Sequence, residues 1–202
     1  MIEFIIIIIL LIIFFMVKQK DVYTVAYELG KTYLDNIICS PNYAVMFDID
    51  DTLILNDKPI KPIINLIKEC NKRNIQVLII TARDSIHTVG TIEDLLNVGI
   101  YPNPNNPDFT NIYNHFQINI PKNAVFYDFY YLRHSPKDDN EMFKSNVKKE
   151  LTKDGIYTIM SIGDNEIDII GDYSGYFIKL PNIHDPRLFH KDSSGRMVNV
   201  KV

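Results

Sequence analysis

Residues 43–53 read YAVMFDIDDTL, an apolar run followed by three aspartates, Asp48, Asp50 and Asp51. A continuous apolar run such as YAVMF (43–47) is typical of a strand that is buried on both faces of a sheet. The aspartates follow that strand directly, so they would lie at its carboxyl end. Carboxylates held this close together raise one another's proton affinity unless a cation neutralises them. The stretch therefore predicts a buried strand with a cation site at its end.

The rest of the chain alternates apolar runs with segments of helical periodicity. The predicted strands are 43–47, 75–81, 124–132, 157–164 and 176–180. The predicted helical segments are 21–40 (one or two helices), 60–74, 91–99 and 144–155. Strands that alternate with helices predict an α/β fold, in which helices flank a parallel sheet and ligands bind at the carboxyl ends of the strands.

Residues at the ends of two predicted helices support these assignments. Pro62 stands near the start of the 60–74 helix and Lys72 near its end, as is usual for proline and for cations that complement the helix dipole. Thr91 and Asp94 have the spacing of a helix cap, and Gly99 is a typical stop. Between the helix ended by Gly99 and the next strand, residues 101–123 are rich in Asn and Pro, which predicts a surface excursion or a small accessory element.

Composition limits the domain count and the class of partner. The chain has 202 residues, of which 47% are hydrophobic, enough for one globular domain with a sizeable core. A net charge of -4 gives no basic surface for counterion release, so duplex nucleic acid is not an expected partner. The two cysteines, Cys39 and Cys70, lack metal-ligand spacing, and we expect both to be reduced and buried.

The N-terminus has a membrane-seeking composition. Residues 4–17 are all apolar, and Glu3 is the only charged residue before Lys18. As a helix this run would reach about 21 Å, short of a hydrocarbon core of about 30 Å, so its length leaves both an anchor and a signal peptide open. A cleavable signal normally has a basic start, which favours an uncleaved membrane anchor over residues 1–20, with 21–202 as the folded domain. Lys18 and Lys20 place that domain in the cytosol by the positive-inside tendency, and secretion after signal cleavage is the alternative.

Polar residues follow three of the predicted strands and would meet at one edge of a parallel sheet. These residues are Asp48, Asp50, Thr81, Asp164 and Asp168, and Lys144, which opens the 144–155 helix, would reach the same edge. Oxygen ligands with spare coordination positions are typical of Mg²⁺, which uses one or two carboxylates, several waters and a substrate phosphate. The pattern therefore predicts a Mg²⁺ site and a phosphorylated substrate.

These motifs resemble those of the haloacid dehalogenase (HAD) superfamily, in the right order. FDIDDTL is similar to its nucleophile motif, IITA to its threonine motif, Lys144 to its lysine and GDNEID to its acidic motif. The stretch from Phe143 to Asn182 is most similar to the class B acid phosphatase branch, which includes plant acid phosphatases and vegetative storage proteins. The resemblance covers roughly residues 21–182 and implies a Rossmann-like phosphatase domain.

The resemblance also implies a role for each motif residue. Asp48 would be the nucleophile that forms an aspartyl-phosphate, and Asp50 would protonate the leaving oxygen and then activate water. Thr81 and the backbone near Ala82 would hold the phosphoryl oxygens, while Lys144 would balance the negative charge. The expected Mg²⁺ ligands are Asp48, the backbone carbonyl of Asp50, Asp164 and Asp168, the last either through water or by orienting Lys144.

The residues leave some alternatives open. Asp51 has a turn or capping role in our interpretation, and Lys148 and Lys149 compete with Lys144 for the lysine position. Too few residues follow the first motif for a cap domain there, so the site would be uncapped or minimally capped and the size of the substrate stays open. A phosphotransferase that uses the same intermediate and a membrane-tethered, non-catalytic scaffold are the alternative functions.

Overall fold

The computed structural model of the chain describes residues 21–135 and 139–200. The predicted membrane anchor at 1–20 lies outside these residues. None of the helices within the described ranges combines the length and hydrophobicity that crossing a bilayer requires.

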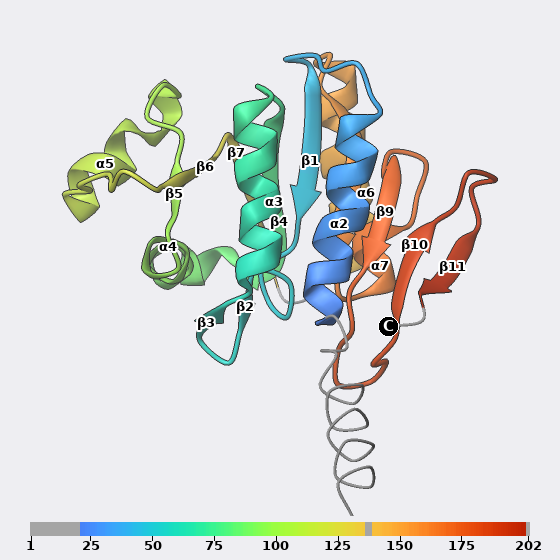
Figure 1. Cartoon of the computed structure of the whole chain (residues 1–202). Coiled ribbons are helices and arrows are strands. Elements are labelled where there is room, and N and C mark those ends of the chain that lie inside the picture. The colour runs from blue at the N-terminus through green and yellow to red at the C-terminus, as the bar shows by residue number, and fades with distance from the viewer. Residues whose placement is uncertain (1–20, 136–138, 201–202) are drawn as a thin grey trace, which may run out of the picture.

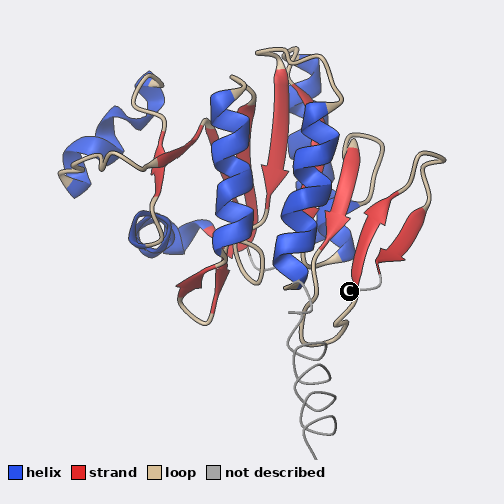
Figure 2. Ribbon diagram, in the orientation of Figure 1, coloured by secondary structure: helices blue, strands red, loops and turns tan. Residues whose placement is uncertain are grey.

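A seven-stranded sheet forms the centre of the described chain, in the order β11-β10-β9-β8-β1-β4-β7 (Figures 1 and 2). The parallel strands are β1 (Tyr43–Phe47), β4 (Gln76–Asp84), β7 (Phe129–Arg133), β8 (Tyr157–Gly163) and β9 (Tyr176–Lys179). β10 (Leu188–Lys191) and β11 (Met197–Val200) extend the sheet in antiparallel fashion beyond β9. The predicted α/β fold with a mostly parallel sheet is confirmed, and the two antiparallel strands were not predicted.

Helices cover both faces of the sheet. α2 (Val22–Asp35) and α3 (Lys61–Lys72) lie side by side on the face turned toward the viewer in Figure 1, and α6 (Asn140–Lys153) lies on the other face. Along β1, Val45 and Phe47 belong to the core beneath α2 and α3, whereas Ala44 and Met46 belong to the core beneath α6. The strand is therefore buried on both faces, as its continuous apolar run predicts.

The predicted strand 124–132 is in fact two strands. β6 (Val125–Tyr127) pairs with β5 (Ile100–Pro102) in a separate small sheet, and β7 joins the main sheet. Asp128 separates them, because its carboxylate accepts the N–H of Val77 at 2.8 Å and its own N–H donates to the carbonyl of Val77 at 2.8 Å. Asp128 interrupts the apolar run AVFYDFYYL (124–132), but one polar residue does not by itself reveal a change of sheet.

The segment predicted as an excursion or accessory element, 101–123, is an accessory element. It carries most of β5, a 3₁₀ turn (Pro107–Phe109) and α5 (Thr110–Phe116), and it projects to one side of the sheet in Figure 1. Phe109 anchors it by packing edge-on against Tyr127, with ring centroids 5.2 Å apart.

Three details of the sequence prediction are wrong. α4 (Thr88–Asn97) begins before Thr91, which is buried inside the helix and does not cap it. α6 begins at Asn140, so Lys144 lies one turn inside the helix instead of opening it. Cys39 is exposed, and only Cys70 is buried as expected. By contrast, α3 carries Pro62 in its first turn, as predicted.

The loop after β1 is short. Asp51 has a positive φ of 53° and donates its N–H to the carbonyl of Ile54 at 2.8 Å, which fits its predicted turn role. A small hairpin of β2 (Ile54–Leu55) and β3 (Lys58–Pro59) follows, and α3 begins directly after it. The carboxyl end of β1 therefore lies beside a compact hairpin.

Candidate active site

Asp48 lies at the carboxyl end of β1, in the middle of the sheet. Its N–H donates to the carbonyl of Ile162 on β8 at 3.0 Å, which continues the pairing of the two strands past Phe47. The residue is only 6% exposed. Because strand pairing fixes the backbone, the carboxylate is held in a buried position at the edge where the parallel strands end.

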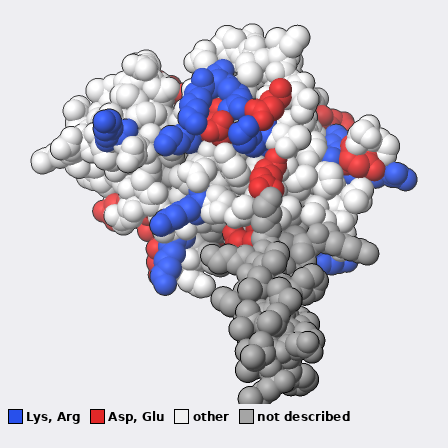
Figure 3. Space-filling view, in the orientation of Figure 1, with Lys and Arg blue, Asp and Glu red and all other residues white. Residues whose placement is uncertain are grey.

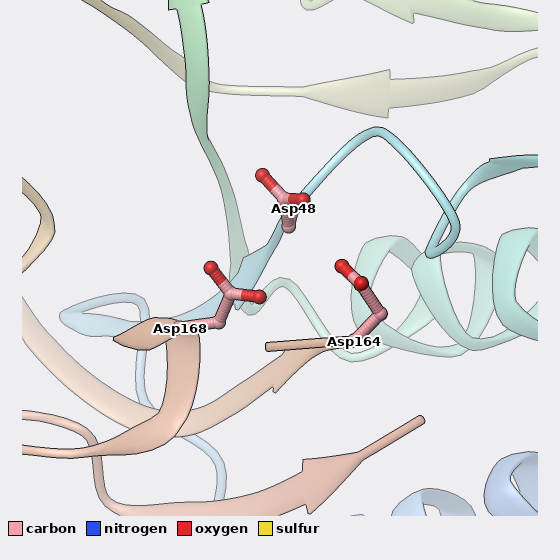
Figure 4. A group of neighbouring side chains, drawn as sticks. All are labelled: Asp48, Asp164 and Asp168. Atoms are coloured by element: carbon pink, nitrogen blue, oxygen red, sulfur yellow. The ribbon is translucent and has the colours of Figure 1, made fainter. Parts of the chain in front are cut away.

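Two further aspartates lie beside Asp48 (Figure 4). Asp164 directly follows β8, and Asp168 belongs to the short helix α7 (Glu166–Ile169) that comes next. Both are buried, and one carboxylate oxygen from each of the three aspartates lies within 4.8 Å of the others. The structure thus brings together Asp48, Asp164 and Asp168 at neighbouring strand ends.

A buried lysine joins two of these carboxylates. The ammonium of Lys144 donates to Oδ1 of Asp48 at 2.7 Å and also to Oδ1 of Asp168. Lys148, the nearest competitor in the sequence, points elsewhere: its ammonium donates to the backbone carbonyl of Asp168 and to the hydroxyl of Ser174. The structure therefore places Lys144, not Lys148, against the carboxylate of Asp48.

The carboxylates carry more negative charge than the contacting ammonium compensates. Burial, opposed by Lys144 and reinforced by Asp168, raises the pKa of Asp48 to about 7. Burial and the charge of Asp168 raise the pKa of Asp164 to about 6. Burial by itself would lower the pKa of Lys144, but the charges of Asp48 and Asp168 outweigh it and raise that pKa. A compact set of buried oxygen donors with excess negative charge fits a hard divalent cation.

Asp50 does not join the carboxylate cluster. Its side chain is 59% exposed and accepts two hydrogen bonds from Arg83, at 2.7 Å from one terminal nitrogen and at 3.0 Å from Nε. Arg83 also pairs with Asp94 of α4 at 2.7 Å. The carboxylate of Asp50 is thus held at the rim of the site, and the predicted role of its carbonyl oxygen as a metal ligand stays a prediction.

The two predicted phosphate-binding residues lie on the neighbouring strand. Thr81 is buried on β4, which continues beyond its predicted end to Asp84, and its hydroxyl accepts the N–H of Arg83 at 3.3 Å. Ala82 is half-buried and lines a surface cavity of about 480 Å³ together with Arg83 and Asp94. This cavity lies next to the Arg83 guanidinium that holds Asp50.

Sequence reasoning missed residues that support the acidic motif. Asn182, after β9, donates to the carbonyl of Asp164 at 2.8 Å and to its Oδ2 at 3.1 Å. The backbone N–H of Asn165 donates to Oδ2 of Asp168 at 3.0 Å. At Gly163, an added Cβ would lie 2.2 Å from the carboxylate of Asp168. Gly163 is the first residue of the GDNEID motif, so the sequence alone could have indicated its importance. Asn182 lies far along the chain, and its contact with Asp164 can be seen only in the folded structure.

Comparison with known proteins points to one family. Residues 55–185 match the family described as HAD superfamily, subfamily IIIB (Acid phosphatase). The class C acid phosphatase from Bacillus anthracis has a similar structure, with a TM-score of 0.50 and 16% sequence identity over 74% of this chain. The chain spans 64% of the length of that relative. No curated protein sequence matches the chain.

Proposed function

Because the chain belongs to subfamily IIIB of the HAD superfamily, the acid phosphatases, we propose that it is a Mg²⁺-dependent phosphomonoester hydrolase that forms an aspartyl-phosphate on Asp48. The observation that supports this most directly is the buried ion pair between Asp48 and Lys144, 2.7 Å long, beside Asp164 and Asp168. A carboxylate paired with a buried ammonium at the end of a central strand is suited to be the nucleophile that such an intermediate requires.

Asp48 attacks the phosphorus atom through one carboxylate oxygen, and the ester oxygen departs as the P–O bond breaks. Lys144 opposes the effect of burial on the pKa of Asp48, so it favours the ionised carboxylate, and it balances the charge of the entering phosphate. Thr81 and the backbone at Ala82, on the adjacent strand β4, donate hydrogen bonds to the phosphoryl oxygens. The aspartyl-phosphate is then hydrolysed to regenerate Asp48 and release inorganic phosphate.

Asp48, Asp164 and Asp168 would hold the metal ion, which would supply positive charge to these carboxylates and to the phosphoryl oxygens. The fit rests on the donor set itself, because three buried carboxylate groups within 4.8 Å face one contacting ammonium.

Asp50 acts as the general acid for the leaving oxygen and then as the general base for water. Its position at the rim, 59% exposed, suits contact with the leaving group rather than with the metal. Arg83 donates a hydrogen bond to each carboxylate oxygen of Asp50 and keeps this carboxylate beside the cavity lined by Ala82.

The test is hydrolysis of para-nitrophenyl phosphate by residues 21–202, with Mg²⁺, with EDTA and with Asp48→Asn. We expect phosphate release that needs both the metal and Asp48. Release that persists in Asp48→Asn would reject the nucleophile, and an absence of release from folded protein between pH 4 and 9 would favour a non-catalytic scaffold. Adding glycerol as an acceptor separates hydrolysis from phosphotransfer.

The arrangement of the chain forms part of the proposal. Residues 21–202 form the phosphatase domain, and residues 1–20, apolar from 4 to 17, attach it to a membrane. The small hairpin of β2 and β3 replaces a larger cap after the first motif, so the substrate enters without the closure of a separate domain.

A further inference from the structure

Lys148 is a second buried lysine beside the carboxylate cluster, and the proposed mechanism does not use it. Figure 3 shows lysine and arginine side chains on the surface of the domain, where charged groups are usual, whereas Lys148 is 0% exposed. The acceptors that its ammonium finds within the described chain are a backbone carbonyl and a hydroxyl, with no carboxylate among them. A buried ammonium without a contacting carboxylate is costly, so an apolar side chain of similar length would serve the core better.

Lys144 and Lys148 both reach Asp168 from α6, which packs against α7 (Figure 1). Lys144 donates to the carboxylate of Asp168, and Lys148 donates to its backbone carbonyl at 3.1 Å. Residues four apart lie on the same face of a helix, so one face of α6 contacts Asp168 at two points. The first contact engages the functional group, and the second engages the backbone that carries it.

The backbone at Asp168 needs such support. α7 has four residues, Glu166–Ile169, and a helix of this length is not stable without contacts from other elements. Asp48 and Asp164, by contrast, directly follow strands of the central sheet. The three carboxylates repel one another when no cation lies between them, and Asp168 is the one whose backbone the sheet does not hold.

Ser174 connects Lys148 to the end of this short helix. Its hydroxyl accepts a hydrogen bond from Lys148 at 2.6 Å and donates to the carbonyl of Ile170 at 2.6 Å. Its own carbonyl accepts from the hydroxyl of Ser161, on β8, at 2.9 Å. The carbonyl groups at the end of a helix lack partners within the helix, and here α6 and the loop after α7 supply them.

We infer that Lys148 and Ser174 are positioning residues for Asp168, which hold the end of α7 so that the Asp168 carboxylate meets both Lys144 and the metal ion. This inference rests on the metal site of the proposed function. Within the described chain, neither residue donates to a carboxylate oxygen of the cluster, so both act through the backbone that carries Asp168. Partners of this kind, one step behind a ligand, typically change metal affinity about 10- to 100-fold.

A positioning role and a purely structural role predict different results for Lys148→Met. Methionine has a similar length, so it removes the hydrogen bonds together with the buried charge. Because the desolvated ammonium is lost as well, we expect the midpoint of urea unfolding to stay the same or to rise. The affinity for Mg²⁺ should nevertheless fall about tenfold or more, since Asp168 is no longer held in place.

The experiment compares Lys148→Met, Ser174→Ala and the double variant in the full chain. Calorimetric titration with Mg²⁺ measures the metal affinity, and urea unfolding measures stability. We expect the double variant to bind Mg²⁺ no more weakly than Lys148→Met, because the two residues act through one contact. Lys149→Met makes the same change at the next residue, which is exposed, and should alter neither quantity.

Amide hydrogen exchange of the metal-free chain gives a second readout that does not depend on Mg²⁺. The N–H of Ile170 donates to the carbonyl of Glu166, and the N–H of Asn165 donates to Oδ2 of Asp168. In Lys148→Met, peptides that cover residues 165–170 should exchange at least about tenfold faster. Peptides from β1 and β8 should keep their rates.

Each result decides one of the two proposals. If the unmodified chain does not bind Mg²⁺, the proposed metal site is wrong, and the exchange of residues 165–170 still decides whether Lys148 positions Asp168. If Lys148→Met lowers the urea midpoint and speeds exchange throughout the domain, the role is structural and the inference is wrong. Unchanged exchange at α7 together with unchanged Mg²⁺ affinity would also overturn it. Ser174→Ala, which loses only a hydroxyl, decides the question by the same readouts if Lys148→Met does not fold.

Discussion

The ammonium of Lys144, on α6, lies 2.7 Å from Oδ1 of Asp48, at the end of β1, although 96 residues separate them in the chain. The side chains are 1% and 8% exposed, so water screens this ion pair very little. Burying both charges costs desolvation energy, and removing either partner would leave the other charge buried without compensation. This pair is the observation on which the proposed role of Asp48 as nucleophile rests.

Replacing Asp48 by Asn should abolish turnover and preserve the fold, because the amide has nearly the same shape but cannot attack phosphorus. The matched control is Asp51→Asn, which makes the same change three residues later, at a positive φ that Asn tolerates. Steady-state kinetics with para-nitrophenyl phosphate and circular dichroism give the readouts. An Asp48→Asn enzyme with metal-dependent activity like that of Asp51→Asn would contradict the assignment.

Lys144→Met should lower kcat/KM by a large but incomplete factor, about 10²- to 10³-fold, since one charge-stabilising donor is lost and the others stay. It should also destabilise the metal-free protein by up to about 3 to 5 kcal/mol, because two buried carboxylates lose their partner. Lys149→Met, on the exposed side of the same helix, is the control and should change neither quantity. Kinetics and urea unfolding measure both quantities. If Lys149→Met lowered kcat/KM and stability as much as Lys144→Met, the cause would be a general disturbance of the helix and not the loss of the ion pair.

Stability should depend on Mg²⁺ and pH together. The pKa of Asp48 is raised to about 7 and that of Asp164 to about 6, so the folded metal-free state binds more protons than the unfolded state between about pH 4 and 7. Stability contributed by this proton uptake is therefore lost as pH rises through that window. A cation that replaces the protons should stabilise more at pH 8 than at pH 5.

Thermal unfolding at several pH values measures this coupling. At about 100 times its Kd, Mg²⁺ should add about 2.7 kcal/mol at pH 8, which corresponds to a rise of about 5 to 10 °C in Tm for a chain of this size. The rise should shrink toward pH 5. Asp164→Asn should reduce it at all pH values, and a rise that is unaffected by this variant would place the cation elsewhere.

Gly163→Ala should damage the acidic site although no functional atom is removed. A Cβ at this position would lie 2.2 Å from Oδ2 and 2.3 Å from Cβ of Asp168, so the Asp168 side chain must move. We expect weaker Mg²⁺ binding by calorimetry and a loss of activity that excess Mg²⁺ partly restores. Gly90→Ala, with no atom within 4 Å of the added Cβ, is the control and should leave metal binding unchanged.

The sequence is most informative where a single strand carries both the core and the chemistry. The continuous apolar run 44–47 predicts a strand whose side chains alternate between two cores, and the structure shows this alternation. Because Asp48 follows the run directly, the sequence also predicts that it lies at the carboxyl end of the strand. The meeting of Asp48 with Asp164 could be expected for the same reason, because parallel strands end at one edge.

Other features depend on tertiary contacts that local patterns do not contain. Asp128 ends one strand and starts another by hydrogen bonding to Val77, and no periodicity marks that change. The Asn182 side chain reaches Asp164 only because the loop after β9 folds back. Asp50 and Asp48 lie two residues apart and look alike in the sequence, yet Arg83 holds the first at the rim while Lys144 holds the second inside.

This separation of Asp50 from Asp48 leads to a test of the general acid. Asp50→Asn should slow the hydrolysis of an alkyl phosphate by about 10²- to 10⁴-fold, because the departing alkoxide needs a proton. It should slow the first step with para-nitrophenyl phosphate, the formation of the aspartyl-phosphate, far less, because nitrophenolate leaves without a proton. With the nitrophenyl ester the second step then limits turnover, since no base activates water, and the aspartyl-phosphate should accumulate. Rapid-quench labelling of Asp48 measures that accumulation.

Arg83→Gln provides the comparison for this variant. It frees Asp50 from its two hydrogen bonds without removing the acid, and an exposed ion pair of this kind contributes little to stability, about 1 kcal/mol or less. The variant should lower kcat/KM for alkyl phosphates more than for the nitrophenyl ester. This is the same substrate preference as for Asp50→Asn, but both factors should be smaller. If the two esters lost equal factors in Asp50→Asn, the proton would have another source, and Arg83 would bind phosphate rather than position the acid.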